Sequence, residues 1–261
     1  MTANELFQAG RLDEAVTAVV QEVKDQPGDL SRRTLLFSLL CFQGDLERAR
    51  KQLSAIDSLT TQTDAAAYLN LLAAEESRRQ VFHDGALPKF FVDPPTRIEK
   101  SLTALRRIKE HNFAEAHRLL DEAEEARPEF AGTFNGASFD DFADADDVTR
   151  SVVEFFQGRD YYWLPVDQLL QLQVVVPDPI RPRDLFWAPC QVFFKDGKAQ
   201  RGFTSVLYID SFQAHDDSLR LGHSTSFHDT GHGVFRGTGR KQFVAGDADP
   251  TPLELNDVTF A

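Results

Sequence analysis

Five aspartates stand close together in the middle of the chain, at Asp140, Asp141, Asp144, Asp146 and Asp147. Several carboxylate oxygens in one loop are the ligands that Ca²⁺ prefers. The calcium-loop pattern is incomplete, because counting from the second or the third of them finds neither Gly at the sixth position nor Glu at the twelfth. We therefore expect a solvated linker or a helix N-terminus, where carboxylates meet unpaired N–H groups. A bound ion is the alternative.

Three histidines have spacings that suggest a metal site. His228 and His232 are four residues apart, as in a helix that presents two ligands to zinc, and His223 precedes them. Gly231 and Gly233 flank the last histidine, which disfavours a helix there. The sequence therefore predicts no metal centre, and a metal-dependent enzyme using this histidine-rich stretch is kept as an alternative.

Other motifs of catalysis are also incomplete. The glycine-rich segment Gly231–Gly239 has neither the Walker spacing nor its Lys-Ser/Thr pair, so turns between strands are expected. No Gly-x-Ser-x-Gly sequence occurs, and Cys190 has no base near it in the sequence. Cys41, the other cysteine, is 149 positions away, which is typical of a reducing compartment rather than of a disulfide framework. We predict a protein that is not an enzyme, with no catalytic residue and no cofactor.

The elements that would position these residues differ between two parts of the chain. Up to Phe130 there are 13 Glu and 9 Asp, and after it 2 Glu and 17 Asp. Glu favours helices, whereas Asp favours turns. We therefore predict an α+β protein in two parts, a helical domain over 1–130 and a mainly β domain over 131–261.

The first part contains a degenerate repeat of the tetratricopeptide kind. Gly10–Ala15 is echoed 34 residues later by Gly44–Ala49, and a third copy is His111–Ala116. The first residue of each copy is expected at the turn between two helices, and the Ala five positions later is expected where the helices pack closely. A further helix is predicted over 64–82 and a loop over 83–93. Helix starts are predicted at Thr2 and Thr96, each followed by Glu at capping-box spacing.

The second part reads as short strands bounded by Gly, Pro or Asp. These are 161–164, 173–176, 191–194, 203–209, 242–245 and the tail 253–260. Lys195–Lys198 has the composition of a hairpin turn. One leading helix is expected over about Val148–Phe156, followed by a small barrel or a bent sheet. The aromatic residues of 161–163 and 186–187 are expected in the core, with an exposed partner-binding patch as the alternative.

Charge and hydropathy narrow the environment. The formal net charge is −13, so that binding to nucleic acid would be opposed electrostatically. No run of 18 apolar residues occurs, and the opening residues lack the pattern of a signal peptide. We expect a cytoplasmic protein with no direct membrane insertion.

Five segments in the second part, taken in order, resemble the ImpE/TagJ family of type VI secretion accessory proteins. The segments are Phe139–Asp147, Gly158–Pro165, Arg183–Trp187, Leu219–Gly222 and Arg236–Asp247. The resemblance implies degenerate tetratricopeptide-like helices followed by a sheet-rich domain. It also implies binding to the N-terminal helix of the sheath small subunit (TssB) and assistance to the AAA+ ATPase ClpV in disassembling contracted sheath. It supplies no catalytic residue.

The sequence departs from the family pattern at two places, Ser224–Phe227 and the Ser205-Val206 pair before Leu207. If a partner helix binds the first-helix side of the repeats, Arg32, Arg33 and Phe37 are the candidate contacts, because they lie on the first helix of the second repeat. The sheet domain could equally bind the partner. A general peptide-binding scaffold in another assembly is the alternative function.

Overall fold

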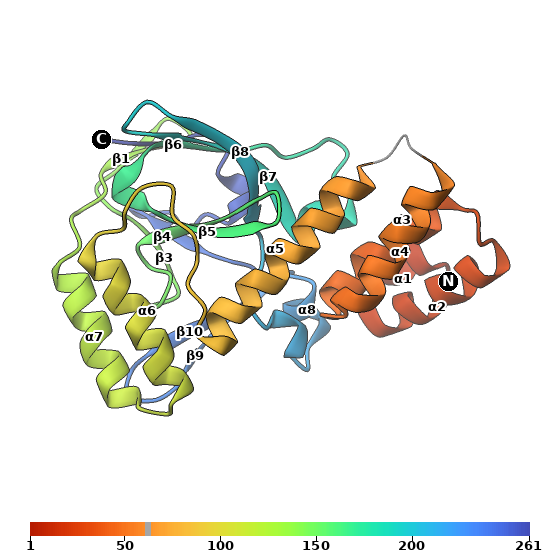
Figure 1. Ribbon diagram of the computed structural model, residues 1–261, viewed down its shortest axis with the longest axis horizontal. Coiled ribbons are helices and arrows are strands. Elements are labelled where there is room, and N and C mark those ends of the chain that lie inside the picture. The colour runs from red at the N-terminus through yellow and green to blue at the C-terminus, as the bar shows by residue number, and fades with distance from the viewer. Residues whose placement is uncertain (61–63) are drawn as a thin grey trace.

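The computed structural model describes residues 1–60 and 64–261. Its N-terminal helices are α1 (Ala3–Gln8), α2 (Leu12–Asp25), α3 (Leu30–Phe42), α4 (Leu46–Leu59), α5 (Ala65–Asp84), α6 (Thr96–Lys109) and α7 (Phe113–Glu125). In Figure 1, α1–α4 lie at one end of the molecule and α6–α7 at the other, with α5 running diagonally between them. The long helix α5 therefore links the two groups of helices.

The three predicted turns share one geometry. Gly10, Gly44 and His111 have φ of 73°, 74° and 57°. In each turn, the N–H of the next residue donates a hydrogen bond to the carbonyl of the residue five positions before it. Hairpins α1–α2, α3–α4 and α6–α7 result. Glycine adopts positive φ without strain, whereas His111 accepts a rarer conformation. The predicted helix over 64–82 corresponds to α5.

Of the two predicted capping boxes, one is present. Thr2 accepts a hydrogen bond from the N–H of Glu5, and the Glu5 carboxylate accepts one from the N–H of Thr2. The box predicted at Thr96 is wrong, because Pro95 is the N-cap of α6 and Thr96 is already its first residue. A proline immediately before a helix fixes φ and needs no capped N–H of its own.

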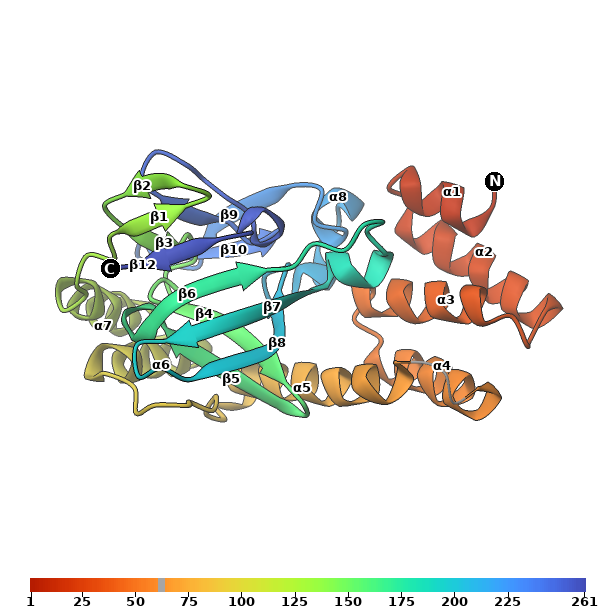
Figure 2. The same cartoon turned by 90° about the horizontal axis from the view of Figure 1, so that it is seen from above.

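The C-terminal part is a mainly antiparallel sheet. Its strands are β1 (Gly132–Phe134), β2 (Ala137–Phe139), β3 (Phe142–Asp144), β4 (Val152–Gln157), β5 (Asp160–Pro165), β6 (Leu169–Val174), β7 (Trp187–Phe194), β8 (Ala199–Ser205), β9 (Thr225–Asp229), β10 (Phe235–Gly239), β11 (Phe243–Ala245) and β12 (Val258–Phe260). Eight of them are ordered β2-β1-β12-β6-β7-β8-β4-β5, and β9–β10 and β3–β11 form two small sheets. Figure 2 shows the strong twist of the large sheet.

Short helices join some of the strands: η1 (Val166–Gln168), η2 (Pro182–Leu185), η3 (Ser211–Gln213), α8 (Asp217–Arg220) and η4 (Pro252–Glu254). The hairpin predicted at Lys195–Lys198 joins β7 to β8, with Gly197 at φ 85°. The leading helix expected over Val148–Phe156 is wrong. Its second half is strand β4, because the β-branched and aromatic side chains there pair with β5 and are buried on both faces.

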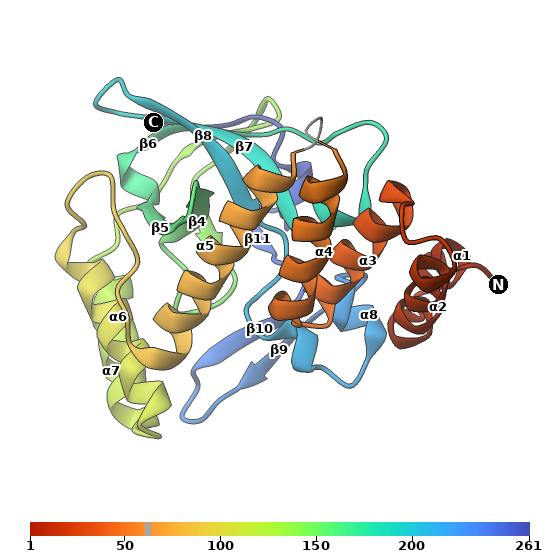
Figure 3. The same cartoon turned by 45° about the vertical axis from the view of Figure 1, so that its right-hand side comes forward.

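One hydrophobic core is shared between helices and sheet. The change from helix to strand falls between Glu125 and Gly132, yet a single buried cluster includes Leu36 of α3, Leu72 of α5 and Trp163 of β5. Figure 3 shows α5 beside β4 and β5. A second cluster lies within the C-terminal part and contains Phe155 and Val192. Of the aromatic residues expected in the core, Tyr161, Trp163, Phe186 and Trp187 are buried, whereas Tyr162 is partly buried.

Candidate partner-binding groove and buried ion network

A cavity of about 650 Å³ lies on the helical side of the molecule. Its walls are α1, the end of α2, the first half of α3, and the short helix η2 that follows β6. The lining residues are Thr2, Asn4, Glu22, Leu30, Ser31, Arg32, Thr34, Leu35, Ser38, Arg181, Pro182 and Arg183. We call this cavity, with the smaller one beside it described below, the groove.

The α3 wall of the groove presents few free polar groups. Thr34 Oγ1 donates to the carbonyl of Leu30 at 2.8 Å, and Ser38 Oγ donates to the carbonyl of Thr34 at 2.9 Å. These hydroxyls are satisfied by their own helix. Their methyl and methylene groups, with Leu35, therefore make a wall that favours apolar anchors.

The opposite wall is built by η2. Asp184 is buried and accepts hydrogen bonds from Arg181 Nε at 2.8 Å and Arg181 Nη2 at 3.0 Å. Pro182 stands at the start of this turn, where its fixed φ is compatible with helical geometry. The turn thereby holds the side chains of Arg181 and Arg183 at the cavity.

The three predicted contact residues are separated by the fold. Arg32 lines the cavity, and its Nε lies 3.3 Å from the carboxylate of Asp29. Arg33 instead reaches away to the Pro27 carbonyl and to Gln52 of α4. Phe37 is completely buried, with its ring against Tyr68 at 5.6 Å between centroids. Arg32 therefore lines the larger cavity, Phe37 lines the smaller one despite its burial, and Arg33 lines neither.

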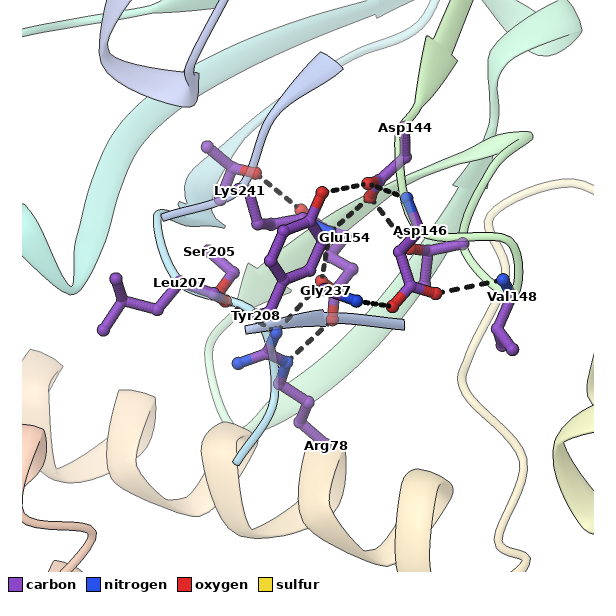
Figure 4. A network of polar contacts seen from close by, with 12 residues as sticks. Arg78, Asp144, Asp146, Val148, Glu154, Ser205, Leu207, Tyr208, Gly237 and Lys241 are labelled. Atoms are coloured by element: carbon purple, nitrogen blue, oxygen red, sulfur yellow. Dashed lines mark hydrogen bonds and ion pairs between the residues drawn. The ribbon is translucent and has the colours of Figure 1, made fainter. Parts of the chain in front are cut away.

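A network of charges is buried where α5 meets the sheet (Figure 4). Arg78 of α5 donates from Nε to Glu154 Oε1 at 2.7 Å and from Nη2 to Glu154 Oε2 at 3.0 Å. Its Nη2 also donates to the carbonyl of Leu207 at 2.9 Å, and its Nη1 donates to Glu75 at 3.3 Å. A bidentate pair of this kind fixes direction as well as distance. It fastens the helix to β4.

The network continues to the strands that carry the aspartate run. Lys241 is 1% exposed and forms ion pairs with Asp144 and with Glu154, the latter at 2.9 Å. The Tyr208 hydroxyl donates to Asp144 at 2.9 Å. Beside it, Asp146 accepts two hydrogen bonds from Arg236 Nε, at 2.8 and 3.0 Å. We call the charged residues Glu75, Arg78, Asp144, Asp146, Glu154, Arg236 and Lys241 the buried network.

Opposing effects set the pKa values in the buried network. Burial alone would raise the pKa of Glu154, but the charges of Arg78 and Lys241 offset burial and lower it to about 2. Burial prevails at Glu75 and Asp144, whose pKa values are raised. Carboxylates outnumber cations in the network by four to three, and neutral donors such as the Trp187 indole N–H, which donates to Glu75 at 3.3 Å, complete its hydrogen bonding.

The expectation of a solvated linker or helix start is wrong for the centre of the aspartate run. Asp144 ends strand β3 and Asp146 follows it, and each is 1% exposed. Their cationic partners, Lys241 and Arg236, are 97 and 90 residues further along the chain, so that no local pattern reveals the pairing. The sequence does indicate that Glu154 is unusual. It is one of two glutamates after Phe130, and it stands in the apolar run Val152–Phe156.

The histidines and the glycine-rich segment lie in and near a hairpin. Among the described residues, no group of three or more His, Cys, Asp or Glu side chains could hold a metal ion. His228 is on β9 and His232 is in the turn before β10, while His223 lies against Gly10 of the first hairpin. Gly231 begins that turn, as expected for turns between strands. Both cysteines are buried and free.

The fold and the groove define a class of protein in which helical hairpins share a core with an antiparallel sheet and carry a cavity on the helical side. The family model of the ImpE protein matches residues 136–259. The chain is 32% identical over 266 residues to the type VI secretion system accessory component TagJ of Pseudomonas aeruginosa, a match that covers 100% of this chain and 91% of that protein. The chain therefore belongs to the ImpE/TagJ family.

A solved structure confirms the fold over the whole length. An X-ray crystal structure of a protein from Vibrio parahaemolyticus matches with a TM-score of 0.90 at 22% identity, covering 99% of this chain and 97% of that one. The helices and the sheet therefore keep this arrangement in a distant sequence. In the described part of the chain, none of the helices has the length and apolar character needed to cross a membrane.

Proposed function

We propose that this protein is a non-enzymatic accessory protein of a bacterial type VI secretion system, acting in the cytoplasm. Its groove binds the N-terminal helix of the sheath small subunit TssB, and this binding assists ClpV in disassembling contracted sheath. Membership of the ImpE/TagJ family supports the accessory role. The single observation that supports the groove as the binding site is the cavity of about 650 Å³ on the first-helix side of two tetratricopeptide-like hairpins.

An amphipathic helix is the occupant that suits this site. Such a helix binds by apolar anchors at i, i+3, i+4 and i+7. Leu30 and Leu35 supply apolar surface on the α3 wall, and the hydroxyls there are already satisfied. A partner that covers this wall therefore does not leave the hydroxyls of Thr34 and Ser38 without a hydrogen bond.

The test is a titration of the fluorescently labelled TssB N-terminal peptide with the full-length protein. In the variant Ser31→Trp, an exposed residue of the lining becomes bulky. We expect this variant to bind at least about tenfold more weakly, because the loss of one apolar anchor corresponds to roughly 1.5 to 3 kcal/mol. Ser58→Trp, on the exposed surface of α4, is the matched control and should bind like the parent protein.

Two other results would redirect the proposal. Equal binding by both variants and the parent would place the site elsewhere, for example on the sheet domain. A scrambled helical peptide that binds as tightly as the TssB peptide would favour a general peptide-binding scaffold. ClpV-driven disassembly of purified sheath, followed by light scattering, tests the second half of the proposal. It should be faster with the parent protein than with Ser31→Trp.

A further inference from the structure

The groove extends past Arg183 into a second cavity. This smaller cavity, of about 230 Å³, lies between α3, α4 and the start of α5. Leu30, Thr34 and Arg183 line both cavities. Arg183 therefore lies where the two cavities adjoin, and a ligand lying along α3 would pass it.

Arg183 is unpaired in a way that the comparable arginines are not. Four arginines have a buried Nε with no hydrogen-bond partner: Arg79, Arg97, Arg183 and Arg220. The other three each donate through an Nη atom, to Gly44, Asp167 and Asp13 respectively. Within the described residues, Arg183 has no side-chain hydrogen bond and no ion pair. A buried donor without a partner is costly unless something supplies the acceptor.

The orientation of this side chain is nevertheless fixed. Its Cζ lies 4.6 Å from the centroid of the Tyr68 ring. Stacking of this kind holds the guanidinium plane while leaving its N–H edge available. The fork that binds a carboxylate is thus held in place before the ligand arrives, which reduces the entropy lost on binding.

The neighbours of Arg183 in its sequence motif have structural contacts that it lacks. Asp184 accepts the hydrogen bonds of Arg181. Phe186 packs edge-on against Phe42 of α3, at 5.5 Å between ring centroids. Trp187 donates its indole N–H to the buried network. In the motif Arg183–Trp187, the arginine is the member whose side-chain nitrogens have no hydrogen-bond partner among the described residues.

Charge identifies the kind of ligand. The lining of the two cavities has three arginines, Arg32, Arg181 and Arg183, against two acidic residues, Glu22 and Asp64, in a chain of net charge −13. Arg32 and Arg181 have aspartate partners of their own. We propose that Arg183 binds a side-chain carboxylate of an acidic amphipathic helix seated in the groove, as a bidentate pair. This inference deepens the proposed function and rests on the groove being its binding site.

The test uses two designed amphipathic peptides that differ at one position. Both carry Leu at i, i+3 and i+7, one has Glu at i+4, and its twin has Gln there. The full-length protein and the variants Arg183→Gln and Arg183→Lys are titrated with each peptide. Arg183→Gln should weaken binding of the Glu peptide by roughly tenfold to a hundredfold and leave the Gln peptide nearly unaffected. Arg183→Lys should fall between, because it keeps the charge and loses the fork.

Controls separate this inference from the proposed function. Arg48→Gln, on the exposed start of α4, should bind like the parent, and circular dichroism of each variant reports folding. Equal loss of both peptides in Arg183→Gln, or no binding of either to the parent, would overturn the carboxylate role. The TssB peptide is titrated in parallel. If it fails to bind while the designed Glu peptide binds through Arg183, the proposed function fails and the inference stands.

Discussion

The buried network and the groove both contain arginines, but they treat them in opposite ways. Arg78 is surrounded by acceptors from α5, from β4 and from the segment after β8. Arg183, in the groove, stacks on one ring and has no acceptor within the described residues. The Arg78 guanidinium is hydrogen-bonded within the fold, whereas the Arg183 guanidinium is available to a ligand. This difference separates charges that hold the molecule together from a charge that can bind a partner.

The positions of the two regions fit this division. The buried network lies where α5 crosses the sheet, so that its ion pairs join elements that are 76 residues apart in the chain. The groove lies on the far side of α3, between hairpins and a short connecting helix. Satisfied buried charges specify how elements meet. A cation without a partner at a cavity does not specify how the elements meet, and it is free to bind a ligand.

The largest effect expected from this comparison is at Arg78. Replacing it by Met leaves the buried carboxylates of Glu75 and Glu154 without their guanidinium partner. Removing one member of a buried ion pair typically costs about 3 to 5 kcal/mol. We therefore expect Arg78→Met to lower the free energy of unfolding by that amount, measured by urea denaturation followed by circular dichroism.

The adjacent residue is the control for this prediction. Arg79→Met removes one hydrogen bond to Gly44 and a stacking contact with Phe212, and it should cost about 1 kcal/mol. The double variant Arg78→Met/Glu154→Met should be less unstable than the sum of the two single variants, because no uncompensated charge of that pair remains. Additive losses would contradict the view that these two side chains act as a pair.

A smaller effect is expected in the pH dependence of stability. The pKa of Glu154 is about 2 in the folded protein against an ordinary value of 4.5. Between these pH values the unfolded chain binds more protons at this group, so that its contribution is complete above about pH 4.5 and is lost as the pH falls through 2. Glu75 and Asp144 have raised pKa values, so their effect on the pH dependence of stability has the opposite sign. Both residues are present in the parent protein and in the variant used for the measurement.

The measurement is urea denaturation at several pH values between 2 and 4.5, for the parent protein and for Glu154→Gln. Gln at this position cannot bind a proton in this pH range. The slope of the variant's unfolding free energy against pH should therefore be smaller by up to about 1.4 kcal/mol per pH unit. Parallel curves for the two proteins would show that the Glu154 carboxylate is not held ionised by Arg78 and Lys241.

Much of the local structure could be predicted from the sequence. The turns at Gly10, Gly44 and His111 follow from a repeat of small or αL-tolerant residues, and Gly197 follows from hairpin composition. In each case the physical determinant lies within a few residues of the turn. The helix expected near Val152 failed because acidic residues before an apolar run resemble a helix start, whereas pairing with β5 decides the outcome.

The two candidate sites were less accessible to prediction. Arg32, Arg33 and Phe37 were named from their place on the first helix of a repeat, and their contact with a partner stays a prediction. Arg32 lines the larger cavity and the buried Phe37 lines the smaller one, because periodicity does not tell which residues of a helix border a cavity. Arg183 had no distinguishing spacing. Arg183 stands out only when its own contacts and those of its neighbours are known. These include contacts between α5 and η2, which are distant in the sequence.

The smallest effect is expected at Arg183, and it is the one that most sharpens the comparison. Arg183→Leu removes no hydrogen bond among the described residues, it loses the contact with the Tyr68 ring, and it relieves a buried Nε that has no acceptor. A cation–π contact and an unmade hydrogen bond are of similar size and opposite sign. We expect the free energy of unfolding to change by less than about 1 kcal/mol, measured under the same conditions as for Arg78→Met. A loss near that of Arg78→Met would mean that Arg183 serves the fold, whereas unchanged stability with weakened binding of the acidic peptide would assign its charge to the partner.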